Sequence, residues 1–596
     1  MRRAQQQLAA TATATRPRFT ASLLTHAAAT ATPLLRPFTT TTQARSSTPF
    51  QPTRRSLSLM AALAAASLLA AGTSYFAQES KAQPATTSET DSALAAKFFS
   101  RDEVRKHTSK EKRVWVTKGD GVYDITEFVD VHPGGERILL AAGYSIDPFW
   151  AIFSVHNSAE TLELLEEYRI GNLLPKDDDP SYNALKDDTK AITQALERLF
   201  KNDPVRDPQL MTRSERPCNA ETPPEKLTDD FVTPNNLFFV RNHLPVPEMD
   251  AHVEIEFDAP WMPDTVKVSL EDLKRKYEHL DVMTTLQCAG NRRKEMHDAK
   301  PVKGLQWTQG AISNAVWTGV PLKKVIEDVC GPIPKEYEDK LQHVHFHGAE
   351  GYGASIPIAK ALDPRGDVLI TFKMNGTELP RDHGGPVRAL VPGHVAARSV
   401  KWVSKITLAE DESESHWQRR DYKGFGPSKT LEESKYEDSL SIQEMPVQSC
   451  ITVPQPGQVV DVNQRAVDSR DEKSVAVKGY AWSGGGRGIV RVDVSGDGGK
   501  TWIDAKLRRP GQQQGREWAW THWEANVPIP ENSLNGGKGS VEIVCKAVDT
   551  SYNEQPEKME SVYNVRGVLV SAWHRVKVEG ILKAMTDRTS NGNTNQ

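Results

Sequence analysis

Short apolar runs separated by polar turns open the patterned part of the chain. Val114–Val116 and Val122–Tyr123 are apolar, and Lys118–Gly121 between them is typical of a tight turn, which predicts a β-hairpin. Apolar residues between Leu162 and Tyr168 recur at helical spacing and predict a short helix. We therefore expect residues 96–174 to form one small α+β domain.

The next segment, residues 175–204, has the composition of a linker. Pro175 and Pro180 enclose an acidic run, which is typical of a hinge or tether rather than of a core element. Residues 184–200 have helical spacing. We expect the linker to let the domain before it move.

Helical and strand patterns are mixed over residues 205–445. Helices are predicted at Leu270–Tyr277 and Leu322–Val329, and strands at Val344–Phe346 and Val368–Phe372. This mixture predicts a single larger α+β domain.

From residue 446 the pattern changes to a period of two. Val490, Val492 and Val494 alternate with polar residues, a turn follows at Asp497–Gly499, and the alternation returns at Val541–Cys545. Several short strands joined by turns predict an antiparallel immunoglobulin-like β-sandwich over residues 446–585. The fold class is therefore α+β multidomain.

The composition excludes some classes of protein. Of the 596 residues, 38% are hydrophobic and 26% charged, which fits folded domains and argues against a disordered or polytopic membrane chain. A net charge of −4 gives no reason to expect a nucleic-acid partner. Five cysteines in a chain of this length cannot form a dense disulfide framework, so any one thiol is a candidate for chemistry.

The N-terminal segment, residues 1–78, has the composition of a targeting sequence. It holds eight arginines and no lysine, aspartate or glutamate, and it is rich in alanine, threonine and serine. Residues 57–76 are uncharged and long enough to span a bilayer, although they are mostly alanine. An arginine-rich leader before an apolar stop predicts sorting to the mitochondrial intermembrane space. The alternative is a retained single-pass membrane anchor at 57–76.

Two histidines predict a haem site. His132 opens a His-Pro-Gly-Gly turn, and His156 follows in an aromatic setting. A haem needs a ligand on each face, and two imidazoles saturate the iron, which favours electron transfer over oxygen binding. Through Trp115-Val116, Tyr123-Asp124, His132–Gly135 and His156, residues 96–174 resemble a cytochrome b5 domain. The resemblance implies that His132 and His156 are the axial ligands of a haem b. A b5-like steroid-binding domain, the alternative, lacks the paired histidines.

Acidic residues gather just after the second histidine. They are Glu160, Glu163, Glu166 and Glu167. Two interpretations stay open: a solvated helix face, or a docking patch for a basic electron acceptor.

A cysteine among arginines is the second chemical feature. Cys288 lies close to Arg292 and Arg293, and nearby cations favour the thiolate. No Cys-x-x-Cys partner supports zinc or an iron–sulfur cluster. A single soft thiolate in a cationic setting suits a metal whose other ligands come from a cofactor, and an anionic substrate. The remaining cysteines are expected in the core: Cys218, Cys330, Cys450 and Cys545.

From Pro217 to His574 the chain closely resembles the sulfite oxidase family of molybdenum-cofactor enzymes. The order of domains is that of the animal members. The matching segments are Phe238–Pro245, Leu286–Arg293, Gly304–Ser313, Tyr352–Pro357, Pro380–Arg388, His416–Phe425, Gly479–Gly486 and Asn564–Gly567.

This resemblance implies a role for individual residues. Cys288 would be the protein ligand of molybdenum. The anion pocket would consist of Arg241, Arg293, Trp307, Tyr422 and Arg566. The pterin and its phosphate would be held by Phe239, Val240, Arg241, Asn242, His243, Glu350, His383, Arg388, Ser399, Val400 and Lys401. The two-pronged guanidinium groups match the oxygens of a small dianion. For His243 and His383, the alternative is a purely structural role.

Three positions depart from the family pattern. Ser399 stands where a histidine is expected, and Gly385 where animal members carry a bulkier residue. Glu350, in a shortened loop, takes the approximate place of an aspartate that contacts the cofactor.

The activity implied is oxidation of sulfite to sulfate, with single electrons passing through the haem to cytochrome c. A homodimer through the sandwich domain is implied as well. There are two alternative functions. A nitrate reductase would place its b5 module after the molybdenum part, followed by a flavin domain. A non-catalytic haem carrier would not need Cys288 or the arginines.

Overall fold

The computed structural model describes residues 97–132, 135–153, 156, 159–181, 185–250, 252–430, 433–462, 473–535 and 538–582. The predicted leader and the apolar segment 57–76 lie outside these residues. Within the described ranges, no helix combines the length and the apolar character needed to cross a membrane.

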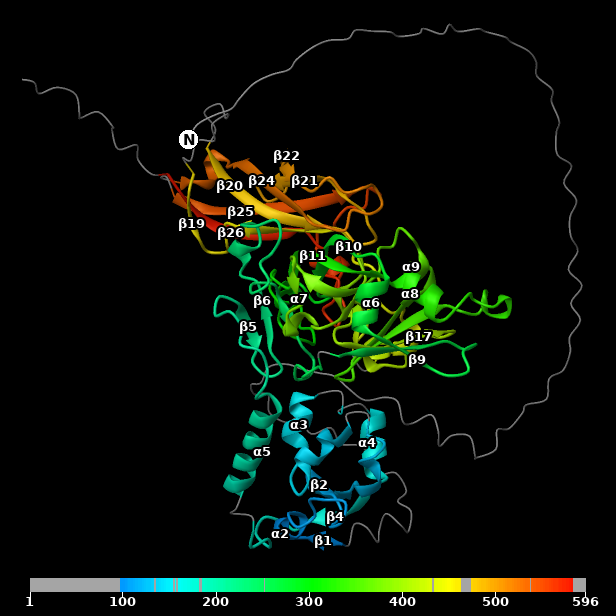
Figure 1. Cartoon of the computed structure of the whole chain (residues 1–596). Helices are drawn as coiled ribbons and strands as arrows, with labels where there is room; N and C mark the ends of the chain where they lie inside the picture. Colours follow the sequence, from blue (N-terminus) through cyan, green and yellow to red (C-terminus); the bar gives the residue numbers. More distant parts are fainter. Residues whose placement is uncertain are drawn as a thin grey trace, which may run out of the picture. The chain divides into compact units, whose positions relative to one another are not determined.

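The N-terminal domain is a small sheet covered by short helices (Figure 1). Its strands have the order β1-β4-β3-β2, and β2 and β3 form the predicted hairpin, with Lys118 opposite Gly121. Val116, Ile125 and Trp150 are buried in its core. The elements are β1 (Phe98–Phe99), α2 (Arg101–Val104), β2 (Trp115–Lys118), β3 (Gly121–Asp124), α3 (Asp147–Ile152), α4 (Ala159–Glu166) and β4 (Arg169–Leu173).

Asp179, the last residue of the acidic run, is bound to this domain, whereas the sequence predicts a hinge or tether rather than a core element. The Asp179 side chain is inaccessible to solvent and pairs with Arg101 at 2.9 Å. Asp179 and Ser181 also accept hydrogen bonds from the backbone N–H groups of Arg101 and Asp102 at the start of α2. Burial opposes ionisation of Asp179, but the hydrogen bonds that it accepts from Ser181 and Arg101 outweigh burial and lower its pKa to about 2. The predicted helix follows as α5 (Leu185–Leu199).

The central domain is built on three sheets. The first has the order β10-β11-β14-β15, with β16 paired to β14; the second is β13-β12-β17-β8-β9; and the third is β5-β6-β7. Both predicted helices and both predicted strands are present. The elements are β5 (Met211–Ser214), β6 (Asn219–Glu221), β7 (Val240–Arg241), β8 (Glu254–Asp258), β9 (Val266–Ser269), α6 (Leu270–Lys276), β10 (Leu280–Gln287), α7 (Arg293–Ala299), β11 (Ile312–Pro321), α8 (Leu322–Val329), β12 (His343–Gly348), β13 (Gly353–Pro357), α9 (Ile358–Leu362), β14 (Leu369–Met374), β15 (Thr377–Glu378), β16 (Arg388–Leu390) and β17 (Val403–Ala409).

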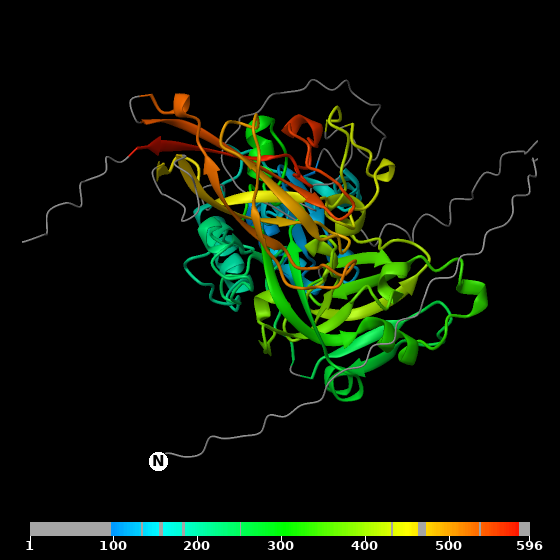
Figure 2. The same ribbon diagram turned by 90° about the horizontal axis from the view of Figure 1, so that it is seen from above.

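The C-terminal domain is a β-sandwich, drawn in yellow to red in Figures 1 and 2. Its sheets are β18-β20-β24-β23 and β19-β26-β25-β21-β22; β19 pairs with β26 in parallel, and the other pairs are antiparallel. The elements are β18 (Gln448–Val453), β19 (Val459–Asp461), β20 (Ser474–Trp482), β21 (Ile489–Ser495), β22 (Ile503–Asp504), β23 (Lys506–Arg508), β24 (Thr521–Pro528), β25 (Lys538–Asp549) and β26 (His574–Ile581).

One detail of the predicted sandwich is wrong. Val492 and Val494 are buried as expected, but Val490 is 38% exposed. The register between β21 and β25 shifts between Ile489 and Arg491, and this irregularity breaks the simple alternation of faces.

The loop after β10 is fixed by the C-terminal domain. Arg292 is fully buried, has a left-handed backbone (φ 66°), and donates to the carbonyl of Ala572 at 2.9 Å and of Ser449 at 3.3 Å. It also forms a two-pronged pair with Glu295, at 2.8 and 2.6 Å. The neighbouring Asn291 donates to the Tyr480 hydroxyl at 2.9 Å. The fold of this loop therefore depends on the domain that follows it in sequence.

Replacing Arg292 with methionine leaves buried carbonyls and the Glu295 carboxylate without their cationic partner. We expect the free energy of unfolding to fall by about 2–4 kcal/mol, less than for a fully buried pair because Glu295 is partly exposed. Denaturant titration measures the change. Lys294→Met is the control. It removes an exposed cation from the first turn of α7, which Arg292 precedes, and should alter stability by less than about 0.5 kcal/mol. Equal effects of both variants would contradict the assignment.

Candidate functional site

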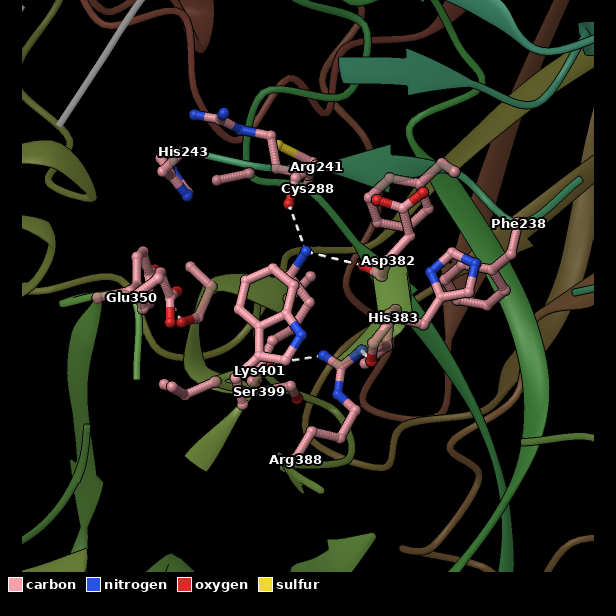
Figure 3. Close-up of a pocket in the computed structure, with 18 of the residues that line it drawn as sticks. Phe238, Arg241, His243, Cys288, Glu350, Asp382, His383, Arg388, Ser399 and Lys401 are labelled. Carbon is pink, nitrogen blue, oxygen red and sulfur yellow. Dashed lines mark hydrogen bonds between the residues drawn. The ribbon is translucent and has the colours of Figure 1, made fainter. Parts of the chain in front are cut away.

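A pocket in the central domain gathers most of the predicted site residues (Figure 3). The space between its walls is about 670 Å³, a figure that includes open solvent. The residues that line it are Phe238, Phe239, Arg241, His243, Leu286, Cys288, Ala289, Glu350, Tyr352, Asp382, His383, Arg388, Ala396, Ala397, Ser399, Val400, Lys401, Trp402 and Tyr422.

Cys288 reaches the pocket because β10 ends one residue before it. The residue is 6% exposed, and its backbone N–H donates to the Ala311 carbonyl at 3.0 Å. The loop then turns so tightly that a Cβ on Gly290 would lie 2.5 Å from the guanidinium of Arg293. That guanidinium donates to the carbonyls of Gly567 and Leu305, each at 2.9 Å. Glycine is needed here because the arginine packs directly on the backbone of the thiol loop.

Arg241 and Tyr422 come from distant segments and meet beside the thiol. Arg241, at the end of β7, donates to Asn219 at 3.0 Å. A hydrogen bond of 3.1 Å joins His243 Nε2 and the Tyr422 hydroxyl. Burial lowers the pKa of His243 and raises that of Tyr422, so the imidazole is neutral and the phenol keeps its proton at neutral pH.

Three further residues of the predicted anion pocket, Arg293, Trp307 and Arg566, do not line the cavity itself. Trp307 is fully buried, and its Nε1 has no hydrogen-bond partner among the described residues. Arg566 pairs with Asp421, yet its Nε is likewise buried without a partner in the described part of the chain. Burying an N–H donor without an acceptor is costly, so both donors fit a site for an oxygen-rich group that is not part of the chain.

The other side of the pocket is strongly cationic. Lys401 Nζ donates to the Arg241 carbonyl at 3.1 Å and to the Asp382 carbonyl at 2.9 Å (Figure 3). It also donates to the Asn242 side chain. Arg388 donates to the carbonyls of His383 at 2.8 Å and Ser399 at 2.6 Å. Burial lowers the pKa of Lys401 to about 7 and that of Arg388 to about 9, as expected for cations held mainly by neutral acceptors. Such a pocket favours an anion.

Glu350 and Ser399, two of the three positions that depart from the family pattern, line the pocket, whereas Gly385 does not. Glu350 is 6% exposed, its Oε2 has no partner among the described residues, and burial raises its pKa to about 7. The Ser399 hydroxyl accepts the backbone N–H of Val391 at 3.0 Å, so the serine fixes the local backbone. Val240 and Asn242, also predicted to hold the cofactor, lie next to lining residues without lining the cavity themselves.

The residues present fit a molybdenum–pterin cofactor. A thiol, a set of buried cations and unpartnered N–H donors are the groups that a metal and a phosphate require. Sequence reasoning missed Tyr352, Asp382 and Trp402 as lining residues, although Tyr352 and Asp382 stand inside segments that carry the resemblance. The remaining four cysteines are buried, as expected.

The two histidines of the N-terminal domain face each other. Their ring centroids are 6.1 Å apart with an angle of 18° between the planes, which leaves room for a metal with bonds of ~2 Å to a nitrogen of each ring. His156 Nδ1 donates to the Phe153 carbonyl at 2.8 Å and so leaves Nε2 available as a ligand. Burial lowers the pKa of His156 to about 4, which keeps it neutral. This geometry fits a haem with two axial histidines.

Comparisons with known proteins agree with both sites. Three family descriptions match: "Cytochrome b5-like Heme/Steroid binding domain" over residues 100–174, "Oxidoreductase molybdopterin binding domain" over 243–417, and "Mo-co oxidoreductase dimerisation domain" over 439–581. "Sulfite oxidase, mitochondrial" of Homo sapiens is 46% identical over 493 residues, which are 81% of this chain and 84% of that protein. "Sulfite oxidase" of Gallus gallus is 47% identical over 80% of this chain and 99% of its own length. "Nitrate reductase [NAD(P)H]" of Hordeum vulgare is 35% identical over 61% of this chain but only 41% of its own length.

The fold and the two sites thus define a molybdopterin oxidoreductase with a haem domain of cytochrome b5 type. The chain belongs to the sulfite oxidase family. Its cofactors are the molybdenum cofactor and haem.

Replacing Glu350 with glutamine should change how stability depends on pH. Because the folded-state pKa is raised from 4.5 to about 7, the folded state holds a proton that the unfolded state has released between these pH values. The free energy of unfolding therefore falls as pH rises through this window. In the cofactor-free protein we expect Glu350→Gln to remove most of this fall, up to about 3 kcal/mol at pH 7 and above. Unfolding measured from pH 4.5 to 8 checks this; Glu336→Gln, at an exposed site, should leave the profile unchanged.

Replacing His156 with alanine should abolish the two-histidine haem. We expect a loss of haem or a spectrum of a haem with one protein ligand, measured by absorption and electron paramagnetic resonance. His107→Ala in the same domain, which removes a histidine that stacks on Trp115 and not on His132, should leave the spectrum unchanged. A normal low-spin spectrum in His156→Ala would contradict the ligand assignment.

Proposed function

We propose that this chain oxidises sulfite to sulfate and passes the electrons singly through its haem to cytochrome c. The observation that carries the proposal is the pocket in which Cys288 lies beside Arg241 and Tyr422, with the unpartnered donors of Trp307 and Arg566 nearby. When bound, the molybdenum cofactor supplies the two-electron oxidation and the oxygen transfer. The residues of the chain bind and orient the substrate and the cofactor, and they neutralise their negative charge.

Sulfite is a small dianion with three oxygens, and the polar groups beside Cys288 suit it. Arg241, Arg293 and Arg566 provide guanidinium charge that a dianion needs once it leaves water. Trp307 Nε1 and the Tyr422 hydroxyl provide directed donors. Because burial raises the pKa of Tyr422, the phenol keeps its proton and can donate it in a hydrogen bond to substrate or product oxygen.

The rest of the pocket is assigned to the pterin. Lys401 and Arg388 supply the positive charge for its phosphate, and the backbone around them is fixed by the hydrogen bonds already described. Phe239, His243 and His383 form apolar and neutral walls, since burial also lowers the pKa of His383, to about 4. Cys288 is assigned as the protein ligand of molybdenum.

The haem domain is assigned as the exit for electrons. Two histidine ligands leave no iron site for oxygen, which suits single-electron transfer. Glu163 and Glu166 of α4, and Glu167 just after it, would attract a basic acceptor such as cytochrome c. Similarity to relatives named as mitochondrial supports location in the mitochondrion, and the leader pattern supports the intermembrane space. The match to a dimerisation domain supports a homodimer through residues 446–585.

Nitrate reduction and a non-catalytic carrier are less well supported. The human and chicken sulfite oxidases match this chain at 46% and 47% identity and along most of their own length, whereas the nitrate reductase match is weaker and partial. A carrier would have no use for a buried thiol in a pocket lined by arginine and lysine. Metal analysis separates this last case: about one molybdenum per chain supports the enzyme, and haem alone supports the carrier.

Steady-state assays with sulfite and oxidised cytochrome c test the proposal directly. We expect turnover by the holoenzyme and near-total loss in Cys288→Ser with the haem spectrum intact, because serine removes the thiolate ligand. Cys330→Ser is a matched control, since it changes a buried thiol that does not line the pocket. Retained activity in Cys288→Ser would refute the metal assignment, and a holoenzyme inactive with sulfite would refute the function.

A further inference from the structure

A carboxylate lines the cationic pocket. Asp382 is only 8% exposed, and its carboxylate lies on the same side of the cavity as Lys401 and His383 (Figure 3). A free carboxylate here would repel the phosphate that the pocket is proposed to hold, and it would compete with that phosphate for Lys401. The pocket therefore needs a group that satisfies this carboxylate.

Arg206 is that group. Its Nε and Nη2 donate to the two carboxylate oxygens of Asp382 at 2.8 and 2.9 Å, which is the two-pronged geometry of the strongest ion pairs. Nη2 also donates to Asp203 at 3.0 Å, and Asp203 in turn accepts the backbone N–H of Val246 at 3.0 Å. The guanidinium is thus held in one position, with 18% of the side chain exposed.

The pair is continuous with the residues that face the cavity. Asn242 Nδ2 donates to Asp382 Oδ1 at 3.0 Å, and Asn242 Oδ1 accepts from Lys401. Lys401 donates to the Asp382 carbonyl as well. Burial alone would raise the pKa of Asp382, but the hydrogen bonds and charge of Arg206 outweigh it, and the pKa is lowered. One chain of contacts therefore runs from Arg206, which does not line the pocket, to the lysine inside it.

We propose that Arg206 is a positioning residue for the anionic cofactor: it keeps the Asp382 carboxylate fully paired, so that Lys401 and Asn242 keep their places. This inference deepens the proposed function and rests on it only in that the pocket binds a pterin phosphate. Arg206 itself touches neither the cavity nor Cys288. Its effect should therefore fall on retention of the cofactor rather than on the chemistry.

The test follows cofactor retention in the purified holoenzyme. Molybdenum, and pterin as its fluorescent oxidised derivative, are measured against haem over time after dilution. In Arg206→Met we expect the cofactor to be lost about 10–100-fold faster than in wild type, the range found when groups that support ligands are removed. Arg381→Met is the matched control. It removes the charge next to Asp382 in the sequence, and within the described part of the chain its guanidinium donates to the carbonyls of Asn202 and Pro247, so wild-type retention is expected.

A double variant separates charge from packing. Arg206→Met leaves the Asp382 carboxylate unpaired, and adding Asp382→Asn removes that charge while keeping an oxygen that can accept from Asn242. We expect Arg206→Met/Asp382→Asn to retain the cofactor several-fold longer than Arg206→Met alone. Loss as fast in the double variant as in the single one would mean that Arg206 acts only as packing, and would overturn the proposal.

The remaining outcomes are also decisive. Retention in Arg206→Met equal to that in Arg381→Met would overturn the inference. Should Arg206→Met not give folded protein, Arg206→Lys decides, because lysine keeps the charge but not the fork: faster loss than in wild type supports the inference, and an unchanged rate overturns it. A wild-type protein that carries no molybdenum would refute the proposed function instead, whatever the variants do.

Discussion

The burial of guanidinium groups against backbone carbonyls is the interaction on which the site depends. Arg292 and Arg293 follow Cys288 closely, and both point into the protein, where they donate to carbonyls of the C-terminal segment. A buried arginine is costly to desolvate, and it is stable here because many of its five donors find acceptors. The consequence is that the thiol loop has one conformation, and that this conformation exists only when the C-terminal domain is folded against it.

The same principle organises the pocket. Lys401 and Arg388 are held mostly by carbonyl groups, which orient a cation without cancelling its charge. The carboxylates, in contrast, have their negative charge compensated or removed. Asp382 is fully paired, and burial raises the pKa of Glu350 to about 7, so that Glu350 holds a proton readily. The pocket thus keeps net positive charge in a region of low dielectric, where an anion gains most from it. The buried, uncompensated cations lower the free energy of unfolding of the protein, and binding of an anion in the pocket offsets this loss.

The site in the haem domain depends on the position of its two histidine rings more than on charge. The rings of His132 and His156 are nearly parallel, and their centroids are 6.1 Å apart, which leaves room for a metal between them. Trp150 stacks on His156. Neutral imidazoles are favoured in this apolar setting, as the lowered pKa of His156 indicates. The acidic linker run is bound to the start of α2, so residues near Asp179 belong physically to this domain and not to a free tether.

The sequence by itself determined the domain order, the few helices and strands with a clear period, the paired histidines and the cysteine among arginines. These features are local: a hydrophobic period, a turn or a short motif is visible without knowing what lies opposite. Only the tertiary structure decided that Val490 is exposed, that Asp179 is buried, and that Arg206 pairs with Asp382, 176 residues away. Irregular strand pairing and long-range ion pairs produce no periodic pattern in the sequence, because they depend on which distant segment of the chain lies opposite.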